Sequence, residues 1–257
     1  HFLEHMCFNG TKNFPGNQVV SWLETKGVKF GQNLNAYTSI DETVYNISNV
    51  PTADIAVQDS CLLILHDWAC DLLLEDAEID KERGVIHEEW RTGQGAMMRM
   101  YEQALPKAYQ GGKYGHRLPI GTIEVIDNFP YQALRDYYET WYRPDQQGII
   151  VVGDIDVDKV EAKIKEIFSP IKMPANAPER KYEPVADNKE PIITIAKDKE
   201  QPSTMIYIWH KYPATPNEAK ENIGYSVQHY MFNMIRMMLD ARLEELRQNA
   251  NPPFIAA

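Results

Sequence analysis

The first fifty residues carry a helical hydrophobic pattern followed by strand-like patterns. Residues 1–9 favour a short helix that ends at Gly10. A second helix is predicted from an N-cap at Asn17 to Gly27, because its apolar residues recur on one side. Three segments rich in β-branched and aromatic residues predict strands, at residues 28–30, 34–39 and 42–50.

Longer helical patterns follow. Thr52 is the predicted cap of a helix over residues 53–74, where apolar residues recur at helical spacing. A further helix is predicted over residues 77–91, and the glycine-, lysine- and proline-containing stretch 106–121 predicts a loop. The other elements predicted before residue 170 are a helix at 136–142, a buried strand at 148–156 and an amphipathic helix at 158–168.

A proline-rich, charged stretch divides the chain. Residues 172–191 are predicted to be a linker between a first domain, residues 1–171, and the beginning of a second domain, residues 192–257. Beyond the linker the pattern predicts strands at 192–197 and 204–210, and mostly helix over 217–248. Strands, hairpins and helices in this order indicate an α+β fold. We expect the chain to be a fragment in which His1 is an internal residue, the first strands are missing and the second domain is truncated.

Composition and charge exclude several classes of protein. The chain has 257 residues and a formal net charge of −11, which argues against a nucleic-acid-binding protein. The longest apolar run, residues 61–74, contains a histidine and two aspartates, so no membrane span is expected. Three cysteines without a C-x-x-C pair predict buried thiols rather than a disulfide framework.

The stretch HFLEH, residues 1–5, carries the first candidate chemistry. On a helix His1 and His5 are one turn apart on the same face, so both rings can reach one Zn²⁺. Glu4 lies on the same side, where a general base for a metal-activated water belongs. Two histidines on a helix are also common as ordinary surface or core residues, and the motif alone does not decide between the two interpretations.

A third ligand is expected from DKERGVIHEEW, residues 80–90. Glu82 and Glu89 are two helical turns apart and share a face, so one could bind the metal while the other supports a histidine. Spacing alone leaves open which of the two touches zinc. The alternative is a solvated acidic face. The remaining histidines, which we interpret as structural residues without a partner at ligand spacing, are His66, His87, His116, His210 and His229.

Together these stretches resemble the inverzincin M16 metallopeptidases, the family of pitrilysin, insulin-degrading enzyme and the mitochondrial processing peptidase. The likeness covers HFLEHMCFNGTKNF, LNAYTS with ETVYNI, ERGVIHEEW, YGHRLPIGTIEVIDNF and YYETWYRPDQQGIIVVGDID, in the order of the family. It is most similar to bacterial members built as two tandem halves. Residues 27–33 look like an insertion relative to the family pattern.

The resemblance implies roles for individual residues. His1, His5 and Glu89 would be zinc ligands, Glu4 the catalytic base, and Glu82 a supporting catalytic residue. The strand at 34–39 would bind an extended peptide at its edge, around Asn35 and Ala36; an ordinary internal strand is the alternative. The peptide would be enclosed with a second half, from the same chain or a homologous subunit.

The implied function is a zinc-dependent endopeptidase acting on peptides or small unfolded proteins. A non-catalytic scaffold or partner subunit of the same family is the main alternative, although such subunits usually lose a site residue and all five are present here. A metal-dependent lyase with a cysteine ligand is a third interpretation, and neither Cys61 nor Cys70 has a setting suited to it. The bacterial likeness favours the periplasm. A ligand at the first position of a helix lacks the preceding turn, so we expect the isolated fragment to bind zinc weakly and to be inactive.

Overall fold

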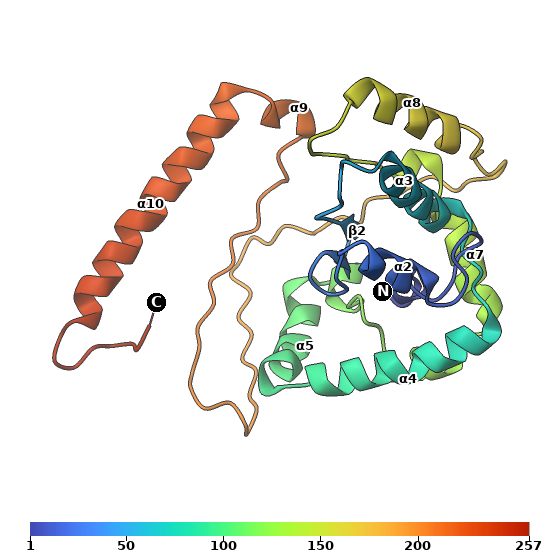
Figure 1. The fold of residues 1–257 in the computed structure, drawn as a ribbon. Coiled ribbons are helices and arrows are strands. Elements are labelled where there is room, and N and C mark those ends of the chain that lie inside the picture. The colour runs from blue at the N-terminus through green and yellow to red at the C-terminus, as the bar shows by residue number, and fades with distance from the viewer. Residues whose placement is uncertain (257) are drawn as a thin grey trace. The chain divides into compact units, whose positions relative to one another are not determined.

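Helices are the main regular secondary structure of the first of two units in the computed structural model, which describes residues 1–256 (Figure 1). The chain divides into His1–Thr204 and Met205–Ala257, and each unit is described by itself. The elements of the first unit are α1 (Phe2–Met6), α2 (Gln18–Thr25), β1 (Leu34–Thr38), β2 (Thr43–Ile47), α3 (Ile55–Cys70), α4 (Asp76–Gly93), α5 (Ala96–Ala108), the 3₁₀ turn η1 (Lys113–Gly115), α6 (Ile123–Asn128), α7 (Tyr131–Trp141), the 3₁₀ turn η2 (Pro144–Gln146) and α8 (Val157–Phe168). Helices combined with an antiparallel sheet confirm the predicted α+β class.

Strands β1 and β2 form an antiparallel hairpin. The register runs from the pair Leu34 and Ile47 to the pair Thr38 and Thr43. Because side chains alternate along a strand, Leu34 and Thr38 share a face with Ala36, while the residues between them are exposed. The inward face of β1 therefore lies on the side where the strand contacts α1.

Two hydrophobic clusters hold the helices around this hairpin. One contains the buried side chains of Val19, Leu23, Leu34, Ile64 and Trp68. The second joins α1 to α4 and α7, and its buried residues are Leu3, Met6, Leu74, Ile79, Leu134 and Tyr138. Helix α1 thus lies between two apolar clusters that fix its position although it is only 5 residues long.

Most predicted helices are confirmed, with corrections at their ends. The long helix begins at Ile55, and its cap is Asp54, whose side chain accepts a hydrogen bond from the Ala56 backbone N–H; the prediction of Thr52 as the cap was wrong. Asn17 does occupy the N-cap of α2, but its side chain makes no capping hydrogen bond. Helix α5 extends through Pro106 into the stretch predicted as loop. Neither α5 nor α6 was predicted, and the six residues of α6 are too few to show a clear period.

Four predicted strands are not formed. Residues 28–30 contribute only an isolated bridge between Phe30 and Leu34. The segments 148–156, 192–197 and 204–210 have no regular secondary structure, and Ile150 and Val152 are 86% and 88% exposed, not buried. A strand is stable only with a neighbour that pairs its backbone groups, and β1 and β2 are the only named strands among the described residues.

The second unit consists of an extended stretch followed by α9 (Asn217–Lys220) and α10 (Ile223–Arg247), as the helical prediction for 217–248 anticipated. Apolar side chains of α10 are exposed, among them Ile223, Met231, Phe232 and Met238. The predicted boundary at 172–191 differs from the division at Thr204, and it stays a prediction.

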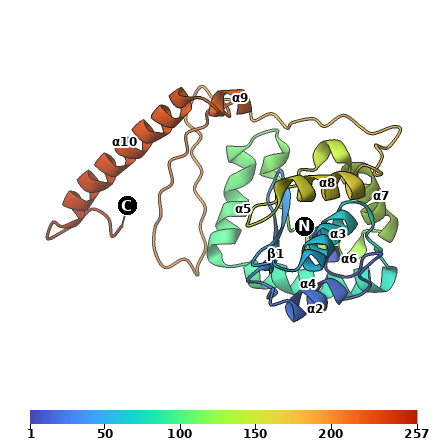
Figure 2. The same ribbon diagram turned by 45° about the horizontal axis from the view of Figure 1, so that its top comes forward.

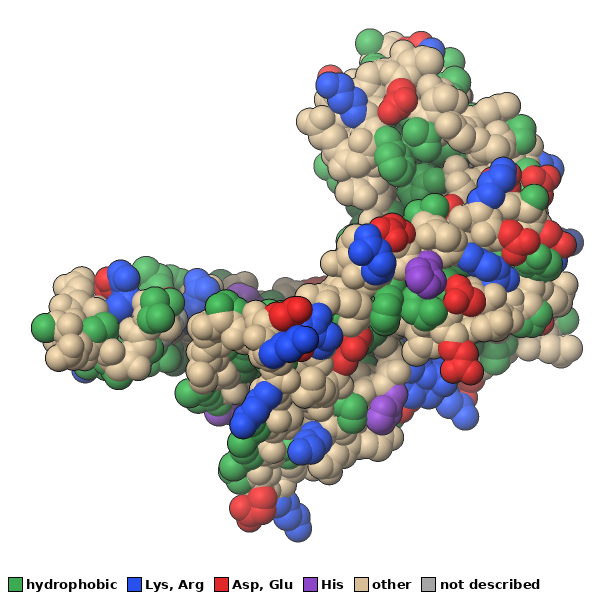
Figure 3. All heavy atoms as spheres, turned by 90° about the horizontal axis from the view of Figure 1, so that it is seen from below, with side chains coloured by type: hydrophobic (Ala, Val, Ile, Leu, Met, Phe, Trp, Pro, Cys, Tyr) green, Lys and Arg blue, Asp and Glu red, His purple; other side chains and the backbone are tan. Residues whose placement is uncertain are grey.

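Among the described residues no helix has the length and apolar content needed to cross a membrane. On the face drawn in Figure 3, Lys and Arg side chains lie among Asp and Glu side chains.

Candidate metal centre

Helix α1 presents the HFLEH motif between the two hydrophobic clusters. Leu3 and Met6 turn into the cluster shared with α4, which leaves His1 and His5 on the remaining side of the helix. The end of the helix is fixed by the Trp68 indole N–H, which donates to the Cys7 carbonyl at 2.7 Å. Packing and this hydrogen bond therefore set the direction in which the two imidazoles point.

Helix α4 offers a matching face. Ile79, Glu82, Ile86 and Glu89 recur at intervals of three and four residues, so they lie along one side of the helix. The two isoleucines are fully buried. Arg83 holds the helix from its flank, because its guanidinium donates to the Phe129 carbonyl at 2.7 Å and lies 4.1 Å from the centre of that phenyl ring. Because α4 contacts α1 and Glu82 Oε1 lies 2.7 Å from His5 Nδ1, the acidic pair faces α1. Figure 2 shows the course of α4 through the first unit from a second side.

His1, His5 and Glu89 converge on one point. The His1 Nε2 lies 3.4 Å from Glu89 Oε1, and the His5 Nε2 lies 3.4 Å from Glu89 Oε2. The two imidazole centres are 4.7 Å apart, and one ligand atom from each of the three residues falls within 4.8 Å of the others. Residues far apart in the sequence thus meet at a site with an exposed carboxylate and two half-buried rings.

Glu82 orients His5 from the other side of the ring. Its Oε1 lies 2.7 Å from His5 Nδ1, and its Oε2 accepts a hydrogen bond from the Asn9 side-chain amide at 2.5 Å. Burial would lower the pKa of His5, but the hydrogen bond and charge of Glu82, together with Glu89 and Glu4, outweigh it and raise that pKa. Glu82 and Glu89 therefore contact different nitrogens of the His5 ring, Glu82 at Nδ1 and Glu89 at Nε2.

Glu4 lies between the two histidines on α1 and is itself buried. Its Oε2 accepts a hydrogen bond from the Thr38 hydroxyl at 2.5 Å, and the Thr38 and Thr43 hydroxyls are 3.1 Å apart. Neither Thr38 nor Asn9 was predicted from the sequence as a site residue. A signal existed for Asn9, which lies four residues after His5, and for Thr38, which shares a strand face with Ala36.

The residues predicted to bind peptide lie on β1, two and three positions before Thr38. Asn35 is exposed and pairs with Asn46, while Ala36 is half-buried and pairs with Tyr45. On its other side β1 has no strand partner among the described residues.

The donor set and its spacing fit zinc. Two imidazole nitrogens and a carboxylate oxygen are among its usual protein ligands, at about 2.0–2.2 Å from the metal. Ligand atoms at the corners of a tetrahedron of that size are about 3.4 Å apart, which equals the two nitrogen–oxygen distances here. His5 Nδ1 has the acceptor that a metal-binding histidine usually has on its second nitrogen. The equivalent Nδ1 of His1 is buried and has no hydrogen-bond partner among residues 1–256.

A second group of metal-ligand types occurs at the end of α3. His66 has Cys70 four residues on, so the interpretation that it lacks a partner at ligand spacing was wrong; Asp71 completes the group. Its members are already paired with their neighbours: Asp71 contacts Lys12 at 3.4 Å, and Cys70 lies 3.5 Å from the His66 ring. Burial and the nearby aspartates raise the pKa of Cys70 to about 11, which keeps the thiol protonated at neutral pH.

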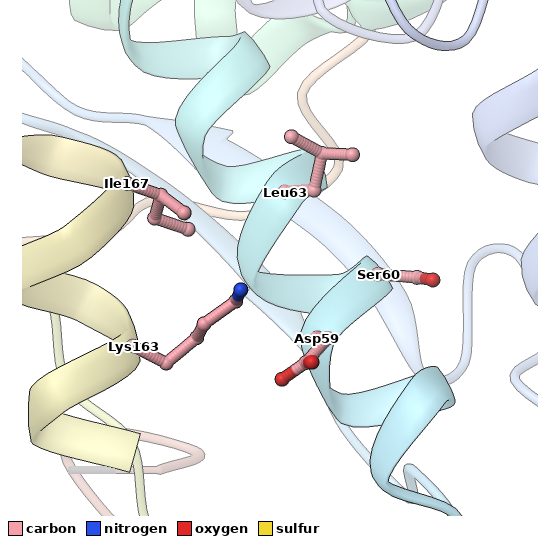
Figure 4. A pocket seen from close by; sticks show the side chains of 5 residues that line it. All are labelled: Asp59, Ser60, Leu63, Lys163 and Ile167. Carbon is pink, nitrogen blue, oxygen red and sulfur yellow. The ribbon is translucent and has the colours of Figure 1, made fainter. Parts of the chain in front are cut away.

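A shallow pocket of about 190 Å³ lies between α3 and α8 (Figure 4). Lys163 extends from α8 toward α3, beside the apolar side chains of Leu63 and Ile167. None of the residues at the His1 centre lines this pocket, and Asp59 is the one metal-ligand type among its lining residues.

The fold and the paired His and Glu residues define an α+β domain with a zinc-type ligand set, and sequence comparison places it in a family. The family model "Insulinase (Peptidase family M16)" matches residues 1–118, and the model "Peptidase M16 inactive domain" matches residues 128–233. The chain belongs to the M16 peptidase family, so the predicted family is confirmed.

Named relatives agree with this membership. The chain is 35% identical over 250 residues to "Probable zinc protease PqqL" of Escherichia coli (strain K12), covering 97% of this chain and 26% of that protein. It is 28% identical over 257 residues to "Zinc protease PQQL-like" of Arabidopsis thaliana, covering 100% of this chain and 26% of that protein. The chain thus spans about a quarter of the length of these relatives.

Solved structures show the same fold. The first half of the periplasmic protease PqqL from Escherichia coli matches with a TM-score of 0.67 and 40% identity, over 73% of this chain and 40% of that one. A mutant of the ferredoxin protease FusC, solved in complex with Arabidopsis ferredoxin, matches with a TM-score of 0.64 and 31% identity, over 71% of this chain and 20% of that one.

Proposed function

We propose that the complete protein is a zinc-dependent endopeptidase that hydrolyses peptides or small unfolded proteins. The observation that carries this proposal is the convergence of His1, His5 and Glu89 at distances suited to one zinc ion. Relatives named as zinc proteases support the same metal and the same reaction.

Each residue of the site has a distinct role in this proposal. His1, His5 and Glu89 hold the metal, and Glu82 fixes the ring of His5 through Nδ1. When bound, zinc supplies the Lewis-acid chemistry that polarises a carbonyl and activates water. Glu4 takes the proton of the attacking water and passes it to the leaving amine.

Strand β1 is the proposed binding site for the substrate backbone. An extended peptide can hydrogen-bond to the edge of a sheet, and β1 has an edge with no strand partner among the described residues. Asn35 and Ala36 would contact the peptide there, close to the Thr38–Glu4 hydrogen bond.

The proposed setting is a protein of two halves. Substrate would be enclosed between this zinc-bearing part, residues 1–171, and a C-terminal half of the same chain or a homologous subunit, with residues 172–191 as linker to residues 192–257. The periplasmic location stated for the PqqL structure supports a periplasmic location here, which fractionation of cells producing the complete protein would test.

Replacing Glu4 tests the reaction. In the complete protein, Glu4→Gln should retain stoichiometric zinc and lose at least about a thousandfold in peptide cleavage, because the amide cannot accept the proton. Glu24→Gln, an exposed change on α2, is the matched control and should leave cleavage unchanged. Undiminished cleavage by Glu4→Gln would remove Glu4 from its role, and absence of zinc from the unmodified protein would refute the proposal.

A further inference from the structure

Thr38 connects the proposed peptide-binding strand to the proposed catalytic base. It is the last residue of β1, and its hydroxyl donates to Glu4 Oε2 at 2.5 Å across the contact between β1 and α1. No other hydrogen bond between side chains of these two elements is present in the described part of the chain. A carboxylate with one oxygen held in this way has a defined rotamer and a defined free oxygen.

The hydroxyl of Thr38 is itself constrained. Thr43, its partner in the register of the hairpin, places its own hydroxyl 3.1 Å away. Because Thr38 donates its proton to Glu4, the Thr43 hydroxyl is the donor in the second contact. Thr43, Thr38 and Glu4 are thus joined by two consecutive hydrogen bonds, whose geometry depends on the pairing of β1 with β2.

Thr38 lies two positions along β1 from Ala36, in the proposed peptide site. Ala36 and Thr38 are on the same strand face, separated by about 6.7 Å at 3.3–3.4 Å per residue. Asn35 and Tyr37 lie on the opposite, exposed face, where the Tyr37 hydroxyl donates to Glu42 instead. A peptide paired with β1 near Ala36 would therefore order the same strand that holds Glu4.

We propose that Thr38 is a positioning residue that fixes the Glu4 carboxylate in its reactive orientation and couples binding of the peptide on β1 to alignment of the base. This inference rests on the proposed peptidase function. The reaction then requires a hydroxyl at position 38, which the hydroxyl at position 43 holds in place. It does not require Thr38 to touch substrate or metal.

The test compares isosteric and conservative changes in the complete protein, with kcat and KM measured on an unstructured peptide. Thr38→Val should lower kcat about ten- to a hundredfold, the equivalent of one hydrogen bond to a charged group, with KM and zinc content unchanged. Thr38→Ser keeps the hydroxyl and should restore most of kcat. Thr43→Val should cause a smaller loss than Thr38→Val.

Thr25→Val is the matched control. Its hydroxyl donates to the Trp22 carbonyl at 2.6 Å on the exposed side of α2, so the same substitution removes a hydrogen bond away from the site. An unchanged kcat in Thr38→Val would overturn the proposal, as would a Thr38→Ser variant as slow as Thr38→Val. The proposal would also be overturned if Thr38→Val binds less zinc, has a changed KM and is less thermally stable, since that pattern indicates a structural role. If the unmodified protein holds no zinc, the proposed function fails; if Glu4→Gln is fully active, Glu4 loses its proposed role and this inference fails with it; if Glu4→Gln is inactive and Thr38→Val is normal, only this inference fails.

Discussion

Removing the Glu82 carboxylate should weaken zinc binding without unfolding the site. Glu82 is 9% exposed and contacts His5 Nδ1 at 2.7 Å and the Asn9 amide at 2.5 Å. In Glu82→Ala both polar groups lose their partner and His5 loses the contact that fixes its ring. Helix α1 should stay docked, because Leu3 and Ile79 remain packed.

The structure gives the size of this effect. A hydrogen bond to a charged group contributes about 1.5–3 kcal/mol. The His5 side chain is 22% exposed, so water can partly replace the carboxylate. We therefore take the lower half of that range as the loss in zinc-binding free energy, about 1.5–2.2 kcal/mol. This corresponds to a roughly 10- to 40-fold weaker zinc affinity and agrees with the effect of losing such a supporting partner elsewhere.

Competition with a chromophoric zinc chelator measures the affinity directly. Glu82→Gln keeps one carbonyl acceptor and should lie between the wild type and Glu82→Ala. Glu88→Ala, on the exposed side of the same helix and paired with Arg91, is the control and should bind zinc normally. Unchanged affinity in Glu82→Ala would refute the orienting role of Glu82. A loss as large as that of Glu89→Ala would show that Glu82 is itself a ligand.

Three further predictions follow from other contacts. Glu89→Gln should lose zinc while Glu88→Gln retains it, as measured by metal analysis after dialysis; equal metal content in both would exclude Glu89 as a ligand. Asp67→Asn should lower the free energy of unfolding by about 2–4 kcal/mol. The reason is that the fully buried Asp67 carboxylate accepts hydrogen bonds from the Thr11 hydroxyl and from two N–H groups of Asn13. Denaturant unfolding measures this free energy, and a change below about 0.5 kcal/mol would contradict the prediction. Iodoacetamide at pH 8 should label Cys7, Cys61 and Cys70 slowly in the native protein and fast in the unfolded one, because burial raises the pKa of all three thiols. Peptide mass spectrometry follows the labelling, and fast labelling of the native protein would contradict the prediction.

The spacing of the glutamates on α4 identified the helix face that they share, but not which of the two lies nearer the Nε2 atoms of the histidines. The spacing of Glu82 and Glu89 predicts a shared face, and both structure and sequence agree on that. Which carboxylate lies nearer the Nε2 atoms depends on how α4 docks against α1. That docking follows from Ile79 and from Arg83 on the Phe129 carbonyl, contacts between segments far apart in the chain. No periodicity within α4 contains this information.

Predicted strands failed for a related reason. The segments 148–156 and 192–197 have the β-branched composition of strands, yet Ile150 and Ile193 are 86% and 79% exposed. β-propensity describes a side chain that fits a pleated, partly buried surface, and it becomes structure only where a neighbouring strand supplies that surface. β1 has such a neighbour in β2, directly after the hairpin turn, and forms as predicted, from Leu34. Local pattern therefore suffices for hairpins and helices, while strands with distant partners depend on pairing that a single segment does not encode.

The same distinction explains why Thr38 was not found from the sequence. His1, Glu4 and His5 lie within five residues, so helical geometry alone brings them together. Thr38 reaches Glu4 only because the hairpin packs beside α1, and a threonine in a strand is otherwise an ordinary residue. Short-range motifs thus identify groups that can bind a metal or move a proton. The spacing placed Glu82 on the shared helix face, but its hydrogen bonds to His5 and Asn9, like that of Thr38 to Glu4, come from tertiary contacts. For that reason the orientation of the proposed base is the property for which the structure adds most to the motif.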